Sequence, residues 1–293
     1  MRNSKTNELV LTGLFTAIII IMAFTPLGYI PLVVINATII HIPVILGSLF
    51  CGPKKGAFLG FVFGFTSCLK ATIVGGTLSS FVFSPVLAAS LVGTSGIFKS
   101  LFIAFVPRIL VGVIPYFVYI GIKKVLASEK KNLWGTVLNV LMSVFLAFGV
   151  YAFLGKMSES LSQAAALGIG IAVGAVVFIV VEAVFIRKST QVIPFVYAGV
   201  AGAMTNTLLV MGSIFVLYKD AYADAIGVAG NAVLGVITGV ISFNGVIEAI
   251  VAAIIVYLVG LVLNTIKPIA AKINSDRFKI NVKSVSYTHL TLP

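Results

Sequence analysis

Long runs of apolar residues constrain this chain more than any other feature. A helix of roughly 20 mostly apolar residues crosses the hydrocarbon core of a bilayer, and eight candidate runs, some short or interrupted, follow one another along the sequence. Hydrophobic residues make up 60% of the chain and charged residues only 10%, unlike the composition of a soluble protein. The sequence predicts an all-α, polytopic membrane bundle of about eight transmembrane helices, over residues 8–27, 36–52, 56–72, 98–122, 133–154, 165–186, 192–217 and 244–266.

The distribution of basic residues predicts how these helices are oriented. With a cytoplasmic N-terminus, fifteen of the 20 Lys and Arg residues fall in cytoplasmic segments, as the positive-inside rule requires. An anionic membrane lipid surface is sufficient to explain the net charge of +12, so we expect no nucleic-acid partner. The five basic residues that fall elsewhere are Lys70, Lys99, Arg108, Lys156 and Lys219.

Two segments on the predicted outer side are long, but parts of them are too apolar to be free loops. Residues 81–92 and 226–241 are expected to fold back over the helices. They would form either a lid over an outward-facing cavity or simple packing at the membrane interface. Both alternatives are compatible with the sequence.

The fifth and sixth runs form a hairpin, residues 133–186, that enters and leaves on the predicted cytoplasmic side. Removing it would invert no neighbouring helix, so we interpret it as an insertion. Glu182 within it is either a paired charge near the inner interface or a subunit contact. The predicted organisation is core helices 1–4 with outer loop 71–97 in residues 1–125, the inserted hairpin in 126–190, core helices 5–6 with outer loop 218–243 in 191–268, and a cytoplasmic polar tail in 269–293.

The sequence contains no constellation typical of an enzyme. Residues 286–293 resemble a translated cloning remnant, so we exclude His289 as a candidate ligand. The only other histidine in the sequence is His41. The nucleophile motif GxSxG and the nucleotide-binding motif GxxxxGK[ST] are both missing. The eight acidic residues lie mostly in loops, so we expect no metal site and no cofactor. Energy from ATP would have to come from separate subunits.

Polar residues on four predicted helices gather in the outer half of the bundle. A guanidinium at membrane depth costs several kcal/mol unless it faces protein, water or an anion, so Arg108 must meet something polar. Amides, one guanidinium and one carboxylate around a cavity suit a small, hydroxylated anion, whose lost water contacts must be replaced. These residues are Asn36, Thr38 and His41; Arg108; Thr205, Asn206 and Thr207; and Asn244 with Glu248.

Each candidate also has a structural interpretation. Asn206 could bond to a neighbouring helix, and His41 could satisfy a carbonyl freed by Pro43. Glu248 could cap the start of the last helix. Arg108 could be a structural partner of Glu248 alone.

Five stretches of the sequence carry a resemblance: residues 36–47 (NATIIHIPVILG), 51–60 (CGPKKGAFLG), 105–112 (FVPRILVG), 202–212 (GAMTNTLLVMG) and 244–249 (NGVIEA). They resemble the substrate-binding S components of energy-coupling factor (ECF) vitamin transporters. The first two look like the second helix, inner turn and third helix of that family, and the other three are similar to its pantothenate branch. The resemblance covers residues 1–125 and 190–268.

The resemblance implies a bacterial membrane protein with a six-helix core, to which the hairpin is added. It implies that Arg108 binds the substrate carboxylate and that Asn206 binds amide or hydroxyl groups, below closing outer loops. It also implies a transmembrane scaffold subunit, contacted through small residues of the first helix, and two ATPase subunits. Gly13 and Ala17 provide such a pair, although Ile21 stands where the next small residue is expected.

The candidate polar residues limit which substrates the cavity could bind. Arg108 would repel a cation, and the single tryptophan, Trp134, lies far from the predicted cavity. Pantothenate fits best because it has a carboxylate, an amide, two hydroxyls and no ring, but riboflavin or folate could stack on Tyr29, Phe81 or Phe83. The alternatives to an S component are a secondary transporter of a small organic anion, with Glu248 carrying a proton, and a non-transporting membrane scaffold. No inverted repeats that would favour the secondary transporter are evident.

Overall fold

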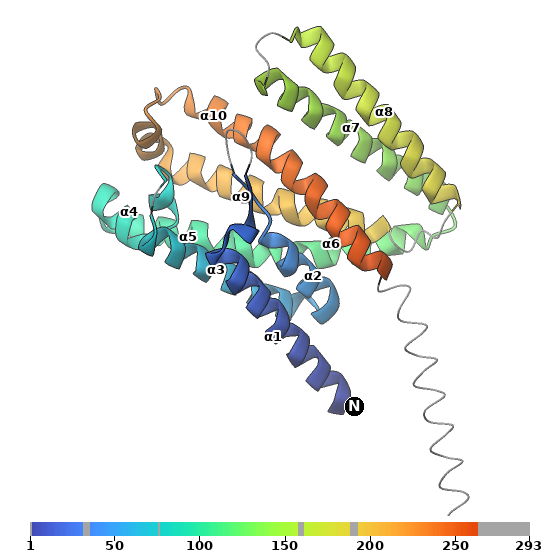
Figure 1. The fold of residues 1–293 in the computed structure, drawn as a ribbon, viewed down its shortest axis with the longest axis horizontal. Helices are drawn as coiled ribbons and strands as arrows, with labels where there is room; N and C mark the ends of the chain where they lie inside the picture. Colours follow the sequence, from blue (N-terminus) through green and yellow to red (C-terminus); the bar gives the residue numbers. More distant parts are fainter. Residues whose placement is uncertain (1, 32–35, 76, 158–160, 188–192, 263–293) are drawn as a thin grey trace, which may run out of the picture.

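The computed structural model describes residues 2–31, 36–75, 77–157, 161–187 and 193–262, and these form a bundle of helices (Figure 1). The predicted tail, 269–293, lies outside the described residues. The helices are α1 (Arg2–Phe24), α2 (His41–Cys51), α3 (Pro53–Ile73), α4 (Pro85–Val92), α5 (Thr94–Val111), α6 (Ile114–Leu126), α7 (Lys131–Met157), α8 (Gln163–Arg187), α9 (Ile193–Ile226) and α10 (Val233–Val240). Short 3₁₀ turns lie at Pro26–Gly28 and Ser80–Val82 (η2), and a π turn at Ile241–Gly245 joins α10 to a helix that runs on to Val262.

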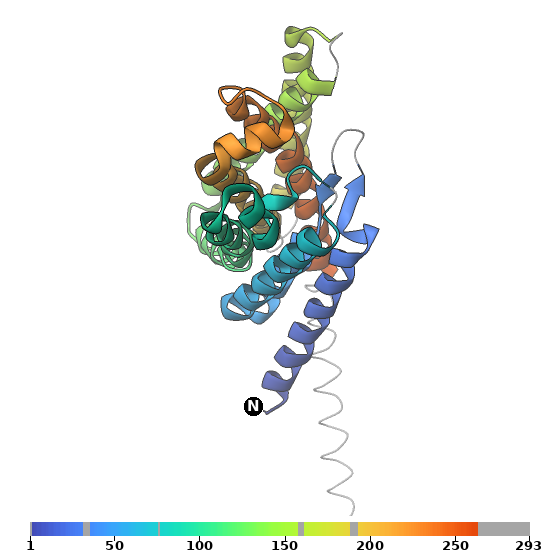
Figure 2. The ribbon, with the colours of Figure 1, turned by 90° about the vertical axis from the view of Figure 1, so that its left-hand side faces the viewer.

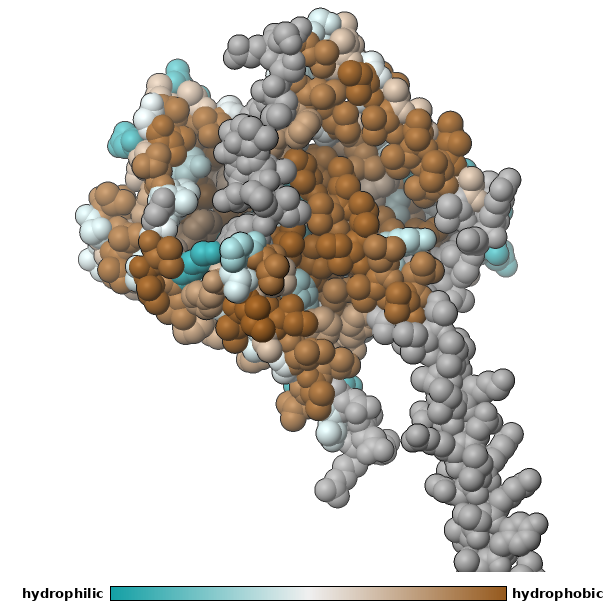
Figure 3. Space-filling model, viewed as in Figure 1, coloured by the Kyte–Doolittle hydropathy of each residue, from teal (hydrophilic) through white to brown (hydrophobic). Residues whose placement is uncertain are grey.

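Six helical segments among the described residues are long and apolar enough to cross a membrane. The two others that the sequence predicts are shorter apolar helices, Glu8–Phe24 and His41–Cys51. Hydrophobic side chains cover most of the surface that faces the viewer in Figure 3. Such a surface suits lipid, and the chain is a multi-pass membrane bundle. The count of eight spans and the cytoplasmic N-terminus stay predictions.

The described elements are helical except for a small hairpin that the sequence analysis did not predict. Strands β1 (Tyr29–Pro31) and β2 (Asn36–Thr38) pair antiparallel, with Ile30 opposite Ala37. The predicted helix over 36–52 is therefore shorter and begins at His41. Pro43 fits there because the first turn of a helix has no intrahelical partners for its N–H groups.

The last helix begins at Val233, eleven residues before the predicted start at 244. Gly227, with φ of +70°, ends α9, and the apolar residues after it start a new helix. The sequence analysis did not predict this helix, but Val233 and Ile237 are buried in one cluster with Phe81 and Tyr218, so this segment does fold back over the helices. In 81–92 the prediction holds for Phe81 and Val82, which are buried, and Phe81 packs edge-on against Tyr218 with ring centroids 5.3 Å apart. Val86 and Leu91, later in this range, are exposed.

A row of glycines brings α3 and α5 unusually close. Gly56, Gly60 and Gly64 lie four residues apart and therefore share one face of α3. A Cβ added at Gly60 would overlap the carbonyl oxygen of Arg108, and one at Gly64 would lie 2.6 Å from the carbonyl oxygen of Ala104. Small residues allow such backbone contact between membrane helices. The row fixes the height and rotation of α5 against α3.

The α7–α8 hairpin packs mainly on itself, at one edge of the bundle (Figures 1 and 2). Thr136 Oγ1 donates to Glu182 Oε1 at 2.7 Å, and Asn139 Nδ2 donates to Glu182 Oε2 at 2.7 Å. Glu182 is thus hydrogen-bonded to two neutral side chains of α7. The hairpin meets the core where Phe153 stacks on Phe243, with ring centroids 4.6 Å apart.

Candidate functional site

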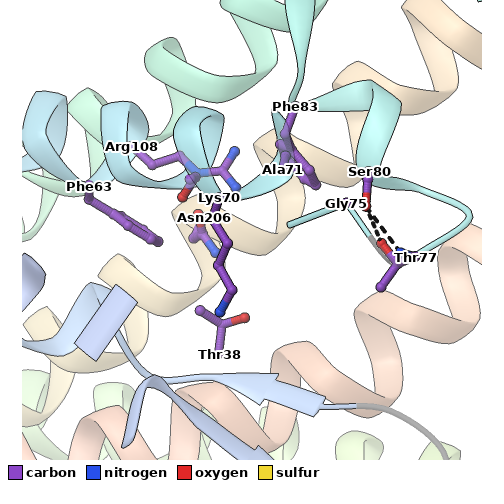
Figure 4. A pocket seen from close by; sticks show the side chains of 11 residues that line it. Thr38, Phe63, Lys70, Ala71, Gly75, Thr77, Ser80, Phe83, Arg108 and Asn206 are labelled. Carbon is purple, nitrogen blue, oxygen red and sulfur yellow. Dashed lines mark hydrogen bonds between the residues drawn. The ribbon is translucent and has the colours of Figure 1, made fainter. Parts of the chain in front are cut away.

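A cavity of about 330 Å³ lies between the β1–β2 hairpin, α3, α5, α9 and the segment before α4. Figure 4 shows the side chains of Arg108, Asn206 and Lys70 extending into this space from three different helices. The wall therefore combines two cations with amide, hydroxyl and aromatic groups. It consists of Thr38, Phe63, Ser67, Lys70, Ala71, Gly75, Thr77, Ser80, Phe83, Arg108 and Asn206.

Arg108 is anchored in the cavity wall by a hydrogen bond within its own helix. It is only 6% exposed, and its Nη1 donates to the carbonyl oxygen of Ile103 at 2.6 Å. Phe83 and Phe63 face the guanidinium, with centroids 4.7 and 5.5 Å from Cζ. Arg108 also interacts electrostatically with Glu248. A position in a cavity wall, with aromatic rings to hold its plane, suits an anion site and is not needed for a purely structural pair.

Lys70 is a second cation in the cavity, and the sequence analysis did not select it. Its Nζ donates to the carbonyl oxygen of Ala23, in the last turn of α1, at 3.0 Å. The last carbonyls of a helix lack intrahelical partners and attract cations, so this bond joins α1 to α3. A signal was present in the sequence, because Lys70 and Arg108 are two of the five basic residues that depart from the positive-inside pattern.

Asn206 brings an unsatisfied acceptor to the cavity. It is 8% exposed, and its Oδ1 has no hydrogen-bond partner among the residues that the structure describes. An unsatisfied buried polar atom is unfavourable by about 1–3 kcal/mol. A hydroxyl or amide N–H of a bound molecule would remove that penalty.

Glu248 lies behind the cavity wall and holds it in place through two hydrogen bonds. Its Oε1 accepts from the backbone N–H of Thr38 at 2.8 Å, and its Oε2 accepts from Thr207 Oγ1 at 2.9 Å. Because Thr38 lines the cavity, the carboxylate ties the β1–β2 hairpin to the last helix and to α9. The sequence suggested that Glu248 could cap the start of the last helix, but that helix begins at Val233 and Glu248 lies inside it.

Replacing Glu248 with leucine is expected to lower the free energy of unfolding by about 3 kcal/mol, because two buried donors lose their acceptor. Glu248→Gln keeps one amide oxygen and should be affected less. Thermal unfolding of the detergent-solubilised protein checks both variants. Wild-type stability in Glu248→Leu would show that the two bonds contribute nothing.

Three of the remaining candidates, His41, Thr205 and Asn244, do not line the cavity. His41 is fully buried beside the backbone of Thr38, and Thr205 Oγ1 donates to the carbonyl oxygen of Ala201 in its own helix at 2.6 Å. Asn244 is buried in the π turn, where its Oδ1 has no partner among the described residues. The backbone of Asn36 belongs to β2, but its side chain is outside the description.

Several lining residues were missed because they come from a segment whose path the sequence does not reveal. Thr77 and Ser80 bond to each other through their hydroxyls at 2.8 Å and close one side of the cavity. Phe83 was considered only as a stacking partner for a ring. Residues 75 and 77–83 thus supply a wall of the cavity, which favours the lid interpretation of outer loop 71–97 over simple interface packing.

Comparison with known proteins assigns the chain to a family. Residues 7–186 match the family model "ECF transporter, substrate-specific component". The pantothenic acid transporter PanT of Lactococcus lactis subsp. cremoris is 42% identical over 161 residues, covering 51% of this chain and 78% of the relative. The pantothenate transporter PanT of Leuconostoc mesenteroides is 27% identical over 277 residues, 93% of this chain and 98% of the relative.

No solved structure matches the chain significantly. The relatives are bacterial transporters, and the six long apolar helices among the described residues agree with a multi-pass protein of a bacterial cell membrane. The match to the family model covers more than half of the sequence. The chain belongs to the family of substrate-specific components of ECF transporters.

Proposed function

We propose that this chain binds pantothenate within the membrane and delivers it to an ECF-type importer. The observation that carries the proposal is the cavity in which Arg108, Lys70 and the unsatisfied Oδ1 of Asn206 meet. The names of two relatives as pantothenate transporters support the choice of vitamin.

The chemistry of the cavity agrees with the groups of pantothenate. A guanidinium binds a carboxylate through two parallel N–H donors, which assigns the carboxylate to Arg108. Asn206 Oδ1 would accept from a hydroxyl or the amide N–H, and the hydroxyls of Ser67, Thr77 and Ser80 line the other side. A cavity of about 330 Å³ is near the lower limit, roughly 300 Å³, of small-molecule pockets.

Riboflavin and folate are less compatible with this wall. Phe83 already faces the guanidinium of Arg108, and Phe81 is buried against Tyr218 instead of lining the cavity. The side chain of Tyr29 is outside the description. Stacking of a flavin or pterin ring on Phe81 or Phe83 would therefore require these side chains to rearrange.

The partners belong to the same proposal. A transmembrane scaffold subunit and two ATPase subunits would supply the energy, since the site described above has no residues for ATP hydrolysis. Gly13 and Ala17 are exposed on α1, and no other atom lies near a Cβ added at Gly13. This open face of α1 is the proposed contact with the scaffold. The division into core residues 1–125 and 191–268 and inserted hairpin 126–190 stays part of the proposal.

Uptake of radiolabelled pantothenate tests the proposed function. In a host without its own pantothenate transporter, we expect uptake only when the scaffold and ATPase subunits are produced together with this chain. Uptake by the chain alone would contradict the proposal and favour a secondary transporter. Production of each subunit is checked in the membrane fraction.

Asn206→Ala is expected to lower the affinity for pantothenate about tenfold, because one hydrogen bond to the ligand is lost. Thr205→Ala is the matched control, since the Thr205 hydroxyl bonds within α9 and the residue does not line the cavity. Its affinity should equal that of the wild type. Calorimetric titration measures both, and equal affinities for all three proteins would remove Asn206 from the site.

A further inference from the structure

Helix α5 carries a proline in its interior, directly before Arg108. In a regular helix the N–H of residue 107 would bond to the carbonyl oxygen of Ile103, four residues earlier. Pro107 has no N–H, so it leaves that oxygen without its helical partner. Ile103 is fully buried, and an unsatisfied carbonyl inside a membrane protein is strongly unfavourable.

The guanidinium of Arg108 takes the place of the missing donor. Its Nη1 lies 2.6 Å from the carbonyl oxygen of Ile103. Helical side chains point back toward the N-terminus, so an arginine at 108 naturally reaches a carbonyl about one turn earlier. The proline thus exposes an acceptor within reach of the next side chain. The acceptor and the donor lie in the same helix, so the geometry needs no other element.

This bond also determines which edge of the guanidinium, and in which plane, faces the cavity. One of its five N–H donors is directed along the helix, and the rings of Phe63 and Phe83 lie on the guanidinium. A carboxylate accepts two parallel N–H bonds only from a guanidinium with the right plane and edge. Preorganisation of this kind strengthens binding by reducing the ordering that binding requires.

We propose that Pro107 is a positioning residue: by freeing the carbonyl of Ile103, it anchors the guanidinium of Arg108 and so determines the preference for a carboxylate ligand. The proposal rests on the proposed function for its choice of ligand, but the internal bond can also be tested without any ligand. With alanine at position 107, the restored N–H competes for the oxygen and the guanidinium loses its anchor. The helix itself should become no less stable, because alanine is the best helix former.

The first test compares pantothenate with panthenol, the neutral alcohol analogue, by calorimetric titration of the detergent-purified full chain. We expect Pro107→Ala to bind pantothenate roughly tenfold more weakly and panthenol as well as the wild type does, because only the carboxylate depends on the anchored guanidinium. Pro53→Ala is the matched control, since Pro53 lies at the first position of α3, where no N–H bond is lost. Equal losses for both ligands, or no loss for either, would overturn the proposal.

The second test uses thermal unfolding of the ligand-free protein. Arg108→Met should lower the melting temperature clearly in the natural background, because the Ile103 carbonyl loses its donor. The same change should have a much smaller effect in Pro107→Ala, where the restored backbone N–H at that position serves the carbonyl. Equal effects in the two backgrounds would overturn the proposal. If the wild type binds neither ligand, the proposed function fails, and this cycle still decides the role of Pro107.

Discussion

Arg108→Lys is expected to lower the affinity for pantothenate at least about 100-fold. The lysine ammonium is a single point charge and cannot form two parallel hydrogen bonds to a carboxylate. It is also shorter, so it would have to give up either the ligand or the buried carbonyl of Ile103, and each charge-assisted bond contributes about 1.5–3 kcal/mol. Calorimetric titration of the purified chain measures the change.

Lys99→Ala provides the control for overall charge. Lys99 lies over the ring of Tyr218, 5.5 Å from its centroid, and does not line the cavity. Removing this cation should leave the affinity unchanged. If Arg108→Lys binds as tightly as the wild type, the carboxylate does not bind through the guanidinium fork.

Gly60→Ala is expected to disturb both folding and binding. The added Cβ would overlap the carbonyl oxygen of Arg108 and lie 2.8 Å from both its carbonyl carbon and the Cα of Ile109. These are backbone atoms, so α3 and α5 must move apart. Overpacking of a tight interface lowers the free energy of unfolding by about 1–3 kcal/mol. Because the Arg108 backbone moves with α5, ligand binding should fall to the detection limit of calorimetry.

The matched control is Gly121→Ala, in the middle of α6. A Cβ at Gly121 meets no atom within 4 Å, so the same chemical change there should leave the protein equally stable or slightly more stable, by about 1 kcal/mol. Thermal unfolding and calorimetry are measured for both variants. Gly60→Ala with the melting temperature and affinity of the wild type would show that the glycine row does not position Arg108.

Features that depend on local sequence were predictable. The apolar runs predict helices because the backbone in a bilayer must satisfy its own hydrogen bonds, and α3, α7 and α8 lie within a few residues of the predicted spans. Arg108 was predictable as a site residue because an isolated cation at membrane depth needs a partner. Its place in a cavity wall, only 6% exposed, agrees with that argument.

Features that depend on contacts between distant segments were not predictable in the same way. In the β1–β2 hairpin, Glu248 accepts from the backbone N–H of Thr38. A backbone donor cannot be predicted from a pattern of side chains. Lys70 departed from the positive-inside pattern, but nothing in the sequence showed where it bonds, because its acceptor, the carbonyl of Ala23, is also backbone. The start of the last helix at Val233 depends on how α9 ends at Gly227, and the apolar residues that follow are equally typical of an interface cap.

The most direct test of the central claim is calorimetric titration of the detergent-purified chain alone with pantothenate, riboflavin and folate. We expect tight binding of pantothenate with one site per chain and no heat of binding from the other two vitamins. Binding of riboflavin or folate instead would agree with the family assignment but contradict pantothenate as the substrate. Absence of binding by a chain that unfolds cooperatively would contradict the assignment of the Arg108 cavity as a vitamin site.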